Sequence, residues 1–225
     1  MKATLPQRVA AEAIGTAFLL AVIIGSGIMG ERLAGGNVAM ALLANSLATA
    51  GGLAALILAL GPVSGAHFNP VVTLAFAMDR NIPWREVAPY VLAQVLFAFV
   101  GVAAAHLMFS EPLFSASVRV RTGPPQWFSE FVAAFGLVVV ILGCARRNGA
   151  WTPVAVAGYI GAAYWFTSST SFANPAVTLA RAASNTFAGV RPDDVAGFIV
   201  AQLAGGVTAT LLMRWVAPHG RSTTP

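Results

Sequence analysis

Charged residues are scarce in this sequence, and their scarcity indicates which solvent surrounds the protein. Only 9% of the 225 residues are Asp, Glu, Lys or Arg, whereas 57% are hydrophobic. Because a soluble domain carries about 25% charged residues, this composition excludes an ordinary water-soluble protein. A single cysteine, Cys144, excludes a disulfide framework, and its apolar surroundings indicate a packing residue.

The usual signatures of metal binding and catalysis are also missing. One cysteine and three histidines form no metal-ligand spacing. No glycine-rich phosphate loop opens a helix after a strand, and no nucleophile–base constellation is present. We therefore expect no metal, no cofactor, no nucleic-acid partner and no enzymatic activity.

Long apolar runs, in contrast, are abundant. Because backbone amides have no water partners in lipid, runs of this length predict helices that cross a bilayer about 30 Å thick. The expected fold class is an all-α polytopic membrane protein with six transmembrane helices. The six runs cover roughly 9–29, 38–60, 87–108, 127–145, 150–167 and 195–217.

The basic residues are scattered singly between these runs and predict the orientation in the membrane. If the N-terminus is cytoplasmic, eight basic residues fall on the cytoplasmic side and five on the other, which favours cytoplasmic termini. The first run is too long for a signal peptide, so we interpret it as a retained helix in a bacterial inner membrane. The eight are Lys2, Arg8, Arg80, Arg85, Arg146, Arg147, Arg214 and Arg221, and the five are Arg32, Arg119, Arg121, Arg181 and Arg191.

Three landmarks recur in the same order in the two halves of the chain. Glu12 corresponds to Glu130, Asn69 to Asn174, and Gln94 to Gln202, with offsets of 118, 105 and 108 residues. Each half holds three spans, and an odd number predicts that the second half enters from the opposite side. We expect one channel domain over 1–225, with repeat 1 at about 1–108, a polar loop at 109–126 and repeat 2 at about 127–225.

An Asn-Pro pair in each half predicts a helix that starts abruptly. Asn69 and Asn174 suit the N-cap, and the proline after each suits the first helical position. Each apolar segment lasts about ten residues, roughly half a bilayer, so the two half-helices should meet near the midplane. The helix starts are Pro70, Val71, Pro175 and Ala176, and the residues expected to line the path before them are Gly65, Ala66, His67, Phe172 and Ala173.

The meeting of two helix starts has an electrostatic consequence. Each start carries about +0.5 charge, which repels a cation but not a neutral solute. The amide groups of Asn69 and Asn174 should keep spare donors for solute hydroxyls. His67 either gates one vestibule or contributes a carbonyl. Glu12 and Glu130 are either a proton relay or acceptors for the irregular backbone, and we favour the second reading because both repeats carry one.

With these residues in place, the chain resembles the major intrinsic protein family, the aquaporins and aquaglyceroporins, over nearly its full length. The resemblance implies six helices plus two half-helices in inverted repeats, usually a homotetramer with one pore per subunit. It also implies passive passage of water or small uncharged solutes. The resemblance rests on Ala11-Glu12, Gly15-Thr16, Ser64 to Pro70, Asn174-Pro175-Ala176, Ala93-Gln94 and Ala201-Gln202.

The sequence departs from the family pattern beside the second Asn-Pro-Ala. Val177 stands where the family usually has the arginine of its narrow filter, and Thr178 stands where glycerol facilitators commonly have aspartate. The resemblance then implies a wide, weakly polar filter. Arg181, about two turns past Asn174, is expected near the outer mouth, against lipid headgroups or carbonyls. The implied filter residues are Thr49, Ala162 (or Gly161), Ser171 and Val177.

The second motif also resembles the bacterial AqpS-type channels of arsenic-resistance operons, which implies a pore for arsenite or organoarsenicals. Water, glycerol, urea, arsenite and methylated arsenicals all remain candidate solutes. Two alternatives stay open, namely an ordinary water or glycerol channel and an ion-coupled secondary transporter with inverted repeats. A membrane enzyme is a distant third.

Overall fold

The structure of the protein is a computed structural model that describes residues 3–146 and 149–217. Lys2, Arg147 and Arg221, used above for orientation, lie outside these residues. The regular secondary structure of these residues is entirely helical, with no strand in either range. Its elements are α1 (Leu5–Leu33), α2 (Val38–Ser64), α3 (Pro70–Met78), η1 (Trp84–Glu86), α4 (Val87–Phe109), α5 (Pro124–Ala145), η2 (Gly149–Trp151), α6 (Thr152–Phe166), α7 (Pro175–Arg181), η3 (Pro192–Asp194) and α8 (Val195–Val216).

Five helices of the described chain are long and apolar enough to cross a membrane, namely α1, α2, α4, α5 and α8. The sixth predicted span, α6, has 15 residues and is about 22 Å long, shorter than a full bilayer crossing. A 3-10 turn, η2, precedes it. The α6 helix packs against α2 and α5, so it completes the bundle despite its length.

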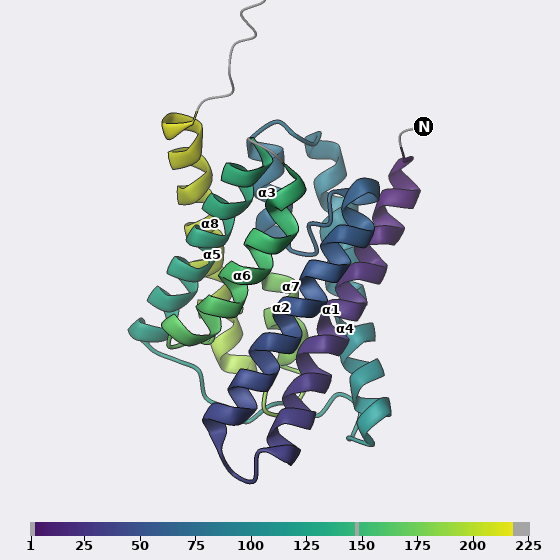
Figure 1. Cartoon of the computed structure of the whole chain (residues 1–225), viewed down its shortest axis with the longest axis vertical. Helices are drawn as coiled ribbons and strands as arrows, with labels where there is room; N and C mark the ends of the chain where they lie inside the picture. Colours follow the sequence, from purple (N-terminus) through teal and green to yellow (C-terminus); the bar gives the residue numbers. More distant parts are fainter. Residues whose placement is uncertain (1–2, 147–148, 218–225) are drawn as a thin grey trace, which may run out of the picture.

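The two half-helices enter the bundle from opposite ends. In Figure 1, α3 lies in the half of the bundle near the start of α1 and the end of α8, whereas α7 lies in the other half. With nine and seven residues, α3 and α7 span about 14 and 11 Å. Each packs against both α4 and α8, so each half-helix contacts both repeats. This arrangement agrees with the predicted inverted repeat.

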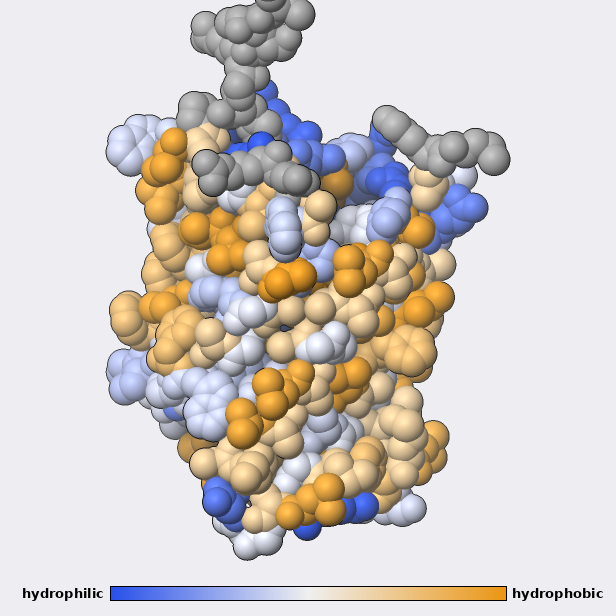
Figure 2. All heavy atoms as spheres, viewed as in Figure 1, coloured by the Kyte–Doolittle hydropathy of each residue, from blue (hydrophilic) through white to orange (hydrophobic). Residues whose placement is uncertain are grey.

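The outer surface is that of a protein in lipid. Figure 2 shows mostly hydrophobic residues over the middle of the visible face and the most hydrophilic ones near the top and the bottom of the bundle. The tryptophans mark the edges of this apolar belt, because their amphipathic rings favour the headgroup level. All five are at least 41% exposed and stand near helix ends, at Trp84, Trp127, Trp151, Trp165 and Trp215. The protein is therefore an integral membrane protein.

Glycine lets two of the long helices approach closely. A Cβ atom at Gly101 of α4 would lie 2.1 Å from the carbonyl oxygen of Ala17 in α1. Small residues at such crossings allow the dispersion contacts that hold helices together in lipid. The α4 helix can therefore pack on α1 only because Gly101 has no side chain.

Replacing Gly101 with alanine is expected to lower the stability of the protein in detergent by about 1–3 kcal/mol, because the backbones must separate. Thermal unfolding of the purified variant measures this loss. Gly51→Ala in α2 is the matched control, since no atom lies within 4 Å of a Cβ built there. The control should be neutral or slightly stabilising, because alanine favours helix more than glycine does. Equal stability of the two variants would contradict the close crossing.

Candidate functional site

The two Asn-Pro caps form a crossed pair at the centre of the bundle. Asn69 Oδ1 accepts a hydrogen bond from Val71 N at 2.9 Å, and Asn174 Oδ1 accepts one from Ala176 N at 3.0 Å. Asn69 Nδ2 donates to the carbonyl of Ala173 at 2.8 Å, across to the other repeat. One amide hydrogen of each cap is thus committed to the opposite loop, which leaves one for a solute.

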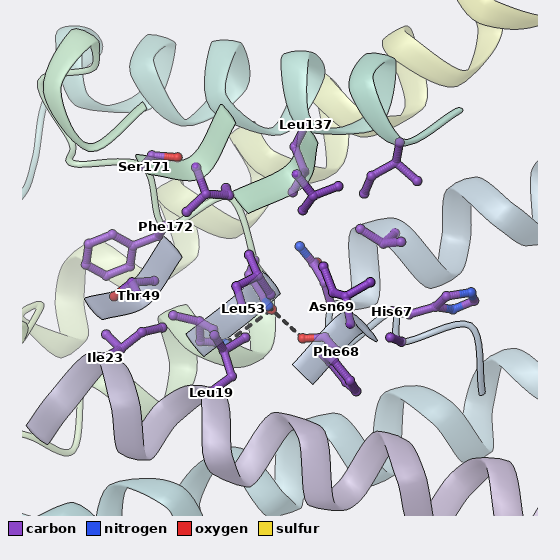
Figure 3. A pocket seen from close by; sticks show the side chains of 18 of the residues that line it. Leu19, Ile23, Thr49, Leu53, His67, Phe68, Asn69, Leu137, Ser171 and Phe172 are labelled. Atoms are coloured by element: carbon purple, nitrogen blue, oxygen red, sulfur yellow. Dashed lines mark hydrogen bonds between the residues drawn. The ribbon is translucent and has the colours of Figure 1, made fainter. Parts of the chain in front are cut away.

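The reciprocal bond completes the cross. Asn174 Nδ2 donates to the carbonyl of Phe68 at 2.8 Å (Figure 3). Sequence reasoning expected both amide hydrogens to be free, whereas each Asn also holds the other repeat's loop in place. Asn69 and Asn174 therefore both stabilise the fold and line the cavity.

The backbone before each half-helix is irregular in the same way in both repeats. Ala66 and Phe68 have φ of 50° and 49°, and their equivalents at the 105-residue offset, Ser171 and Ala173, have 51° and 49°. The left-handed region is unfavourable for residues with a Cβ, at about 1–2 kcal/mol each. Such strain persists only where surrounding contacts over-determine it.

Glu12 supplies those contacts for the first loop. Its carboxylate accepts hydrogen bonds from His67 N (2.9 Å), Phe68 N (2.7 Å), Ser64 Oγ (2.7 Å) and Gln94 Nε2 (2.8 Å). The side chain is fully buried. A buried carboxylate with four donors is the arrangement that buried charge requires.

Glu130 repeats the arrangement in the second loop. It accepts from Phe172 N (2.9 Å), Ala173 N (2.8 Å), Ser169 Oγ (2.5 Å) and Gln202 Nε2 (2.6 Å). Each glutamine also donates to a threonine of its half-helix, Gln94 to Thr73 and Gln202 to Thr178, at 2.9 and 2.8 Å. Neither glutamate lines the cavity, and both carboxylates accept hydrogen bonds from the irregular backbone, which agrees with the structural reading of Glu12 and Glu130.

A cavity of about 90 Å³ runs between the half-helix starts. One water needs only ~10–15 Å³ measured in this way, so the space holds several waters or a small solute. In Figure 3, His67 lies at one end of the row of lining residues, Asn69 in the middle, and Thr49, Ser171 and Phe172 at the other end. The other lining residues are Leu19, Ile23, Leu53, Ile57, Gly65, Ala66, Phe68, Val72, Phe76, Leu137, Ile141, Thr152, Val156, Ile160, Tyr164, Asn174, Val177 and Arg181.

Three of the four expected filter residues, Thr49, Ser171 and Val177, line this cavity. The fourth expectation, Ala162, is wrong in position, because its side chain is exposed on the outer face of α6. Helical spacing explains the error. The cavity face of α6 recurs every fourth residue and reaches Tyr164, whose hydroxyl donates to Thr49 Oγ1 at 3.2 Å.

The alternative filter position, Gly161, does not line the cavity either, because a Cβ there would contact Ala50 of α2. Tyr164 was missed because α6 is apolar all round, so its sequence does not indicate which face turns inward.

Of two expected path residues, Ala173 and His67, the first differs from its prediction and the second lies on the path as expected. Ala173 does not line the cavity; it is fully buried, and its carbonyl is the acceptor of Asn69. His67 does line the cavity, with its ring 4.6 Å from that of Phe76 and its Nδ1 3.1 Å from Thr73 Oγ1. The histidine side chain, as well as its backbone, thus belongs to the wall.

Arg181 corrects another expectation. It is 2% exposed and forms part of the cavity wall, so it does not reach lipid headgroups. The expected carbonyl contact is present, because Nε donates to the carbonyl of Ala188. Its guanidinium carbon lies 3.3 Å from the centroid of the Phe172 ring. Arg181 lies four residues after Val177, and this spacing in the sequence predicts that the two side chains share one face of the helix.

Comparison with known proteins places this geometry in a family. The family model described as major intrinsic protein matches residues 1–168. The chain is 53% identical over 217 residues to the aquaglyceroporin AqpS of Rhizobium meliloti, covering 96% of this chain and 93% of that protein. It is 35% identical over 148 residues to aquaporin NIP1-1 of Oryza sativa, covering 64% of this chain and 50% of that protein.

A solved structure has the same fold. The aquaglyceroporin from Plasmodium falciparum superposes with a TM-score of 0.71 over 96% of this chain and 98% of that chain, at 21% identity. Both the sequence matches and the paired half-helices point to one conclusion. The chain belongs to the major intrinsic protein family of membrane channels.

Proposed function

We propose that the protein is a passive channel for small uncharged solutes, with a wide aquaglyceroporin-like pore. The proposal rests on one observation, a cavity inside the bundle that is lined by both Asn69 and Asn174. Its wall is mostly apolar, with hydrogen-bonding groups at intervals, which suits solutes that have both hydroxyl and apolar surface.

The likeness to AqpS supports a finer proposal, namely that the solutes include arsenite and organoarsenicals as well as glycerol and water. Val177 and Thr49 are small side chains in the wall, and Ser171 is also small. At these three positions the wall offers small, neutral side chains, which leave room for a bulky neutral hydroxide. The valine at position 177, where the family usually has an arginine, argues against an ordinary narrow water channel.

The ion-coupled transporter is the second candidate, and the wall of the cavity argues against it. Among the described residues that line the cavity there is no aspartate or glutamate to carry a coupled proton or sodium ion. The buried acids, Glu12 and Glu130, are committed to backbone and side-chain donors. Passive flow needs neither a coupled ion nor a titratable group in the path.

We also propose a homotetramer in the bacterial inner membrane with both termini cytoplasmic. The start of α1 and the end of α8 share one end of the bundle (Figure 1), so the termini face the same side. The charge bias of the loops favours the cytoplasm for that side. Exposed apolar side chains of α2, among them Leu47 and Leu58, offer surface for lipid or for a neighbouring subunit.

Stopped-flow light scattering on proteoliposomes tests the proposed function. We expect water, glycerol and arsenite, with a methylated arsenical included, to enter faster than in empty liposomes, without an ion gradient. The rate should rise in proportion to concentration, because a channel has no carrier step to saturate. Uptake that saturates at low concentration and requires an ion gradient would instead establish the transporter.

A further inference from the structure

The wall of the cavity carries a positive charge one helical turn beyond the position where the family filter has its arginine. Val177 and Arg181 are four residues apart on α7, so they share a face, and both line the cavity. Val177 is neutral and short. The positive charge in this part of the wall therefore comes from Arg181 and not from position 177.

Arg181 is fixed at this place by neutral partners. Its Nε donates to the carbonyl of Ala188, and the guanidinium carbon lies 3.3 Å from the centroid of the Phe172 ring, a cation–π contact. Within residues 3–146 and 149–217, no carboxylate forms an ion pair with Arg181. Its positive charge is thus not neutralised by a directly paired carboxylate, and the side chain lines the cavity.

A second guanidinium reinforces the first. Arg121, from the loop between α4 and α5, lies 5.1 Å from the centroid of the same Phe172 ring. It donates to the carbonyls of Gly189 and Ser169 at 2.9 and 3.1 Å. Burial lowers the pKa of Arg121 to about 10, so the group remains charged at neutral pH. Two positive groups therefore flank one aromatic ring of the wall.

Among the described residues that line the other end of the cavity there is no arginine or lysine. At the 105-residue offset, Phe76 corresponds to Arg181 and His67 to Phe172. The pair at that end is two rings, with centroids 4.6 Å apart. The repeat thus uses the same two positions for an aromatic contact at one end and a cation–π contact at the other.

We propose that Arg181, assisted by Arg121, is the cation barrier of this channel, displaced by one helical turn from the usual filter position. The inference rests on the proposed function as a channel for uncharged solutes. A cation in the path meets a guanidinium within a low-dielectric wall before it reaches the positive helix starts. A neutral solute meets only the wide, apolar wall at Val177.

Urea and guanidinium provide the matched probes, because both are small planar groups of similar size and only one is charged. In proteoliposomes, the wild type should pass urea and exclude guanidinium. Arg181→Leu should raise the ratio of guanidinium uptake to urea uptake at least about tenfold, because a charge on the wall repels only the charged probe. Arg181→Lys keeps the charge and should keep the exclusion.

Arg181→Gln is the second neutral variant, in case Arg181→Leu does not fold. The glutamine amide can still donate a hydrogen bond to the Ala188 carbonyl. Arg32→Leu is the control for loss of a positive charge elsewhere, since Arg32 pairs with Glu111 outside the cavity. Each variant is first checked for a monodisperse peak in detergent.

Two results would overturn the proposed barrier. One is a wild type that takes up guanidinium as fast as urea, and the other is a folded Arg181→Gln or Arg181→Leu variant that still excludes guanidinium while passing urea. Failure of the proposed function is different and separable. In that case the wild type would admit neither glycerol nor urea.

Discussion

Glu130→Leu is expected to prevent stable folding, because four donors converge on this one carboxylate. Leucine has a similar size but no acceptor, so it leaves Phe172 N, Ala173 N and Ser169 Oγ without this acceptor and leaves Gln202 Nε2 with only its bond to Thr178. An unsatisfied buried donor costs about 1–3 kcal/mol. The combined loss of folding free energy is larger than the contribution of any single surface contact. We therefore expect little or no folded protein in detergent extracts.

Fluorescence-detected size exclusion after stepwise heating measures this loss. Glu130→Gln keeps one side-chain oxygen and should lose less stability than Glu130→Leu. Glu31→Leu is the control, because the exposed pair of Glu31 with Arg119 should contribute about 0–1 kcal/mol. A Glu130→Leu variant that folds like the wild type but conducts no solute would contradict the structural role and would revive the proton-relay reading.

Val177→Arg is expected to convert the wide wall into a narrow, charged one. The new side chain would project toward Thr49 and Ser171, which line the same cavity, and would stand one turn from Arg181, with the same charge. Like charges at this helical spacing repel, so the new guanidinium should turn toward the cavity. Glycerol and arsenite flux should fall at least about tenfold, equivalent to about 1.4 kcal/mol in the barrier. Water flux should fall less.

Stopped-flow rates of glycerol and arsenite, each divided by the water rate, test the change in selectivity. Val177→Leu adds bulk without charge and separates the two causes. Val118→Arg is the control for an added charge, since Val118 lies exposed in the loop between α4 and α5. Unaltered flux of every solute in Val177→Arg would mean that position 177 does not limit the path.

The sequence predicts those parts of the site that local chemistry decides. An Asn followed by Pro starts a helix for reasons that lie within three residues, so Asn69 and Asn174 cap α3 and α7 as expected. The recurrence of Glu12 as Glu130 indicated a shared structural role because both carboxylates precede an irregular loop. The observed bonds to that backbone follow the expectation.

Positions that depend on helix rotation or on distant loops were harder to predict. Ala162 was expected in the filter and Tyr164 was not considered, because an α6 that is apolar all round gives no sign of which side faces inward. Arg121 was not considered, since a residue in an irregular loop has no periodicity to place it. Arg181 could have been placed, because its spacing of four from Val177 fixes the shared face.

The crossed amide bonds have a consequence for biosynthesis. The carbonyl of Phe68 receives its hydrogen only from Asn174, more than a hundred residues later, and Asn69 donates to Ala173. Until the second repeat has been inserted, neither of these two bonds can form, so the first loop lacks the partners that hold it in the finished channel. We therefore expect the two halves to reach their final structure together.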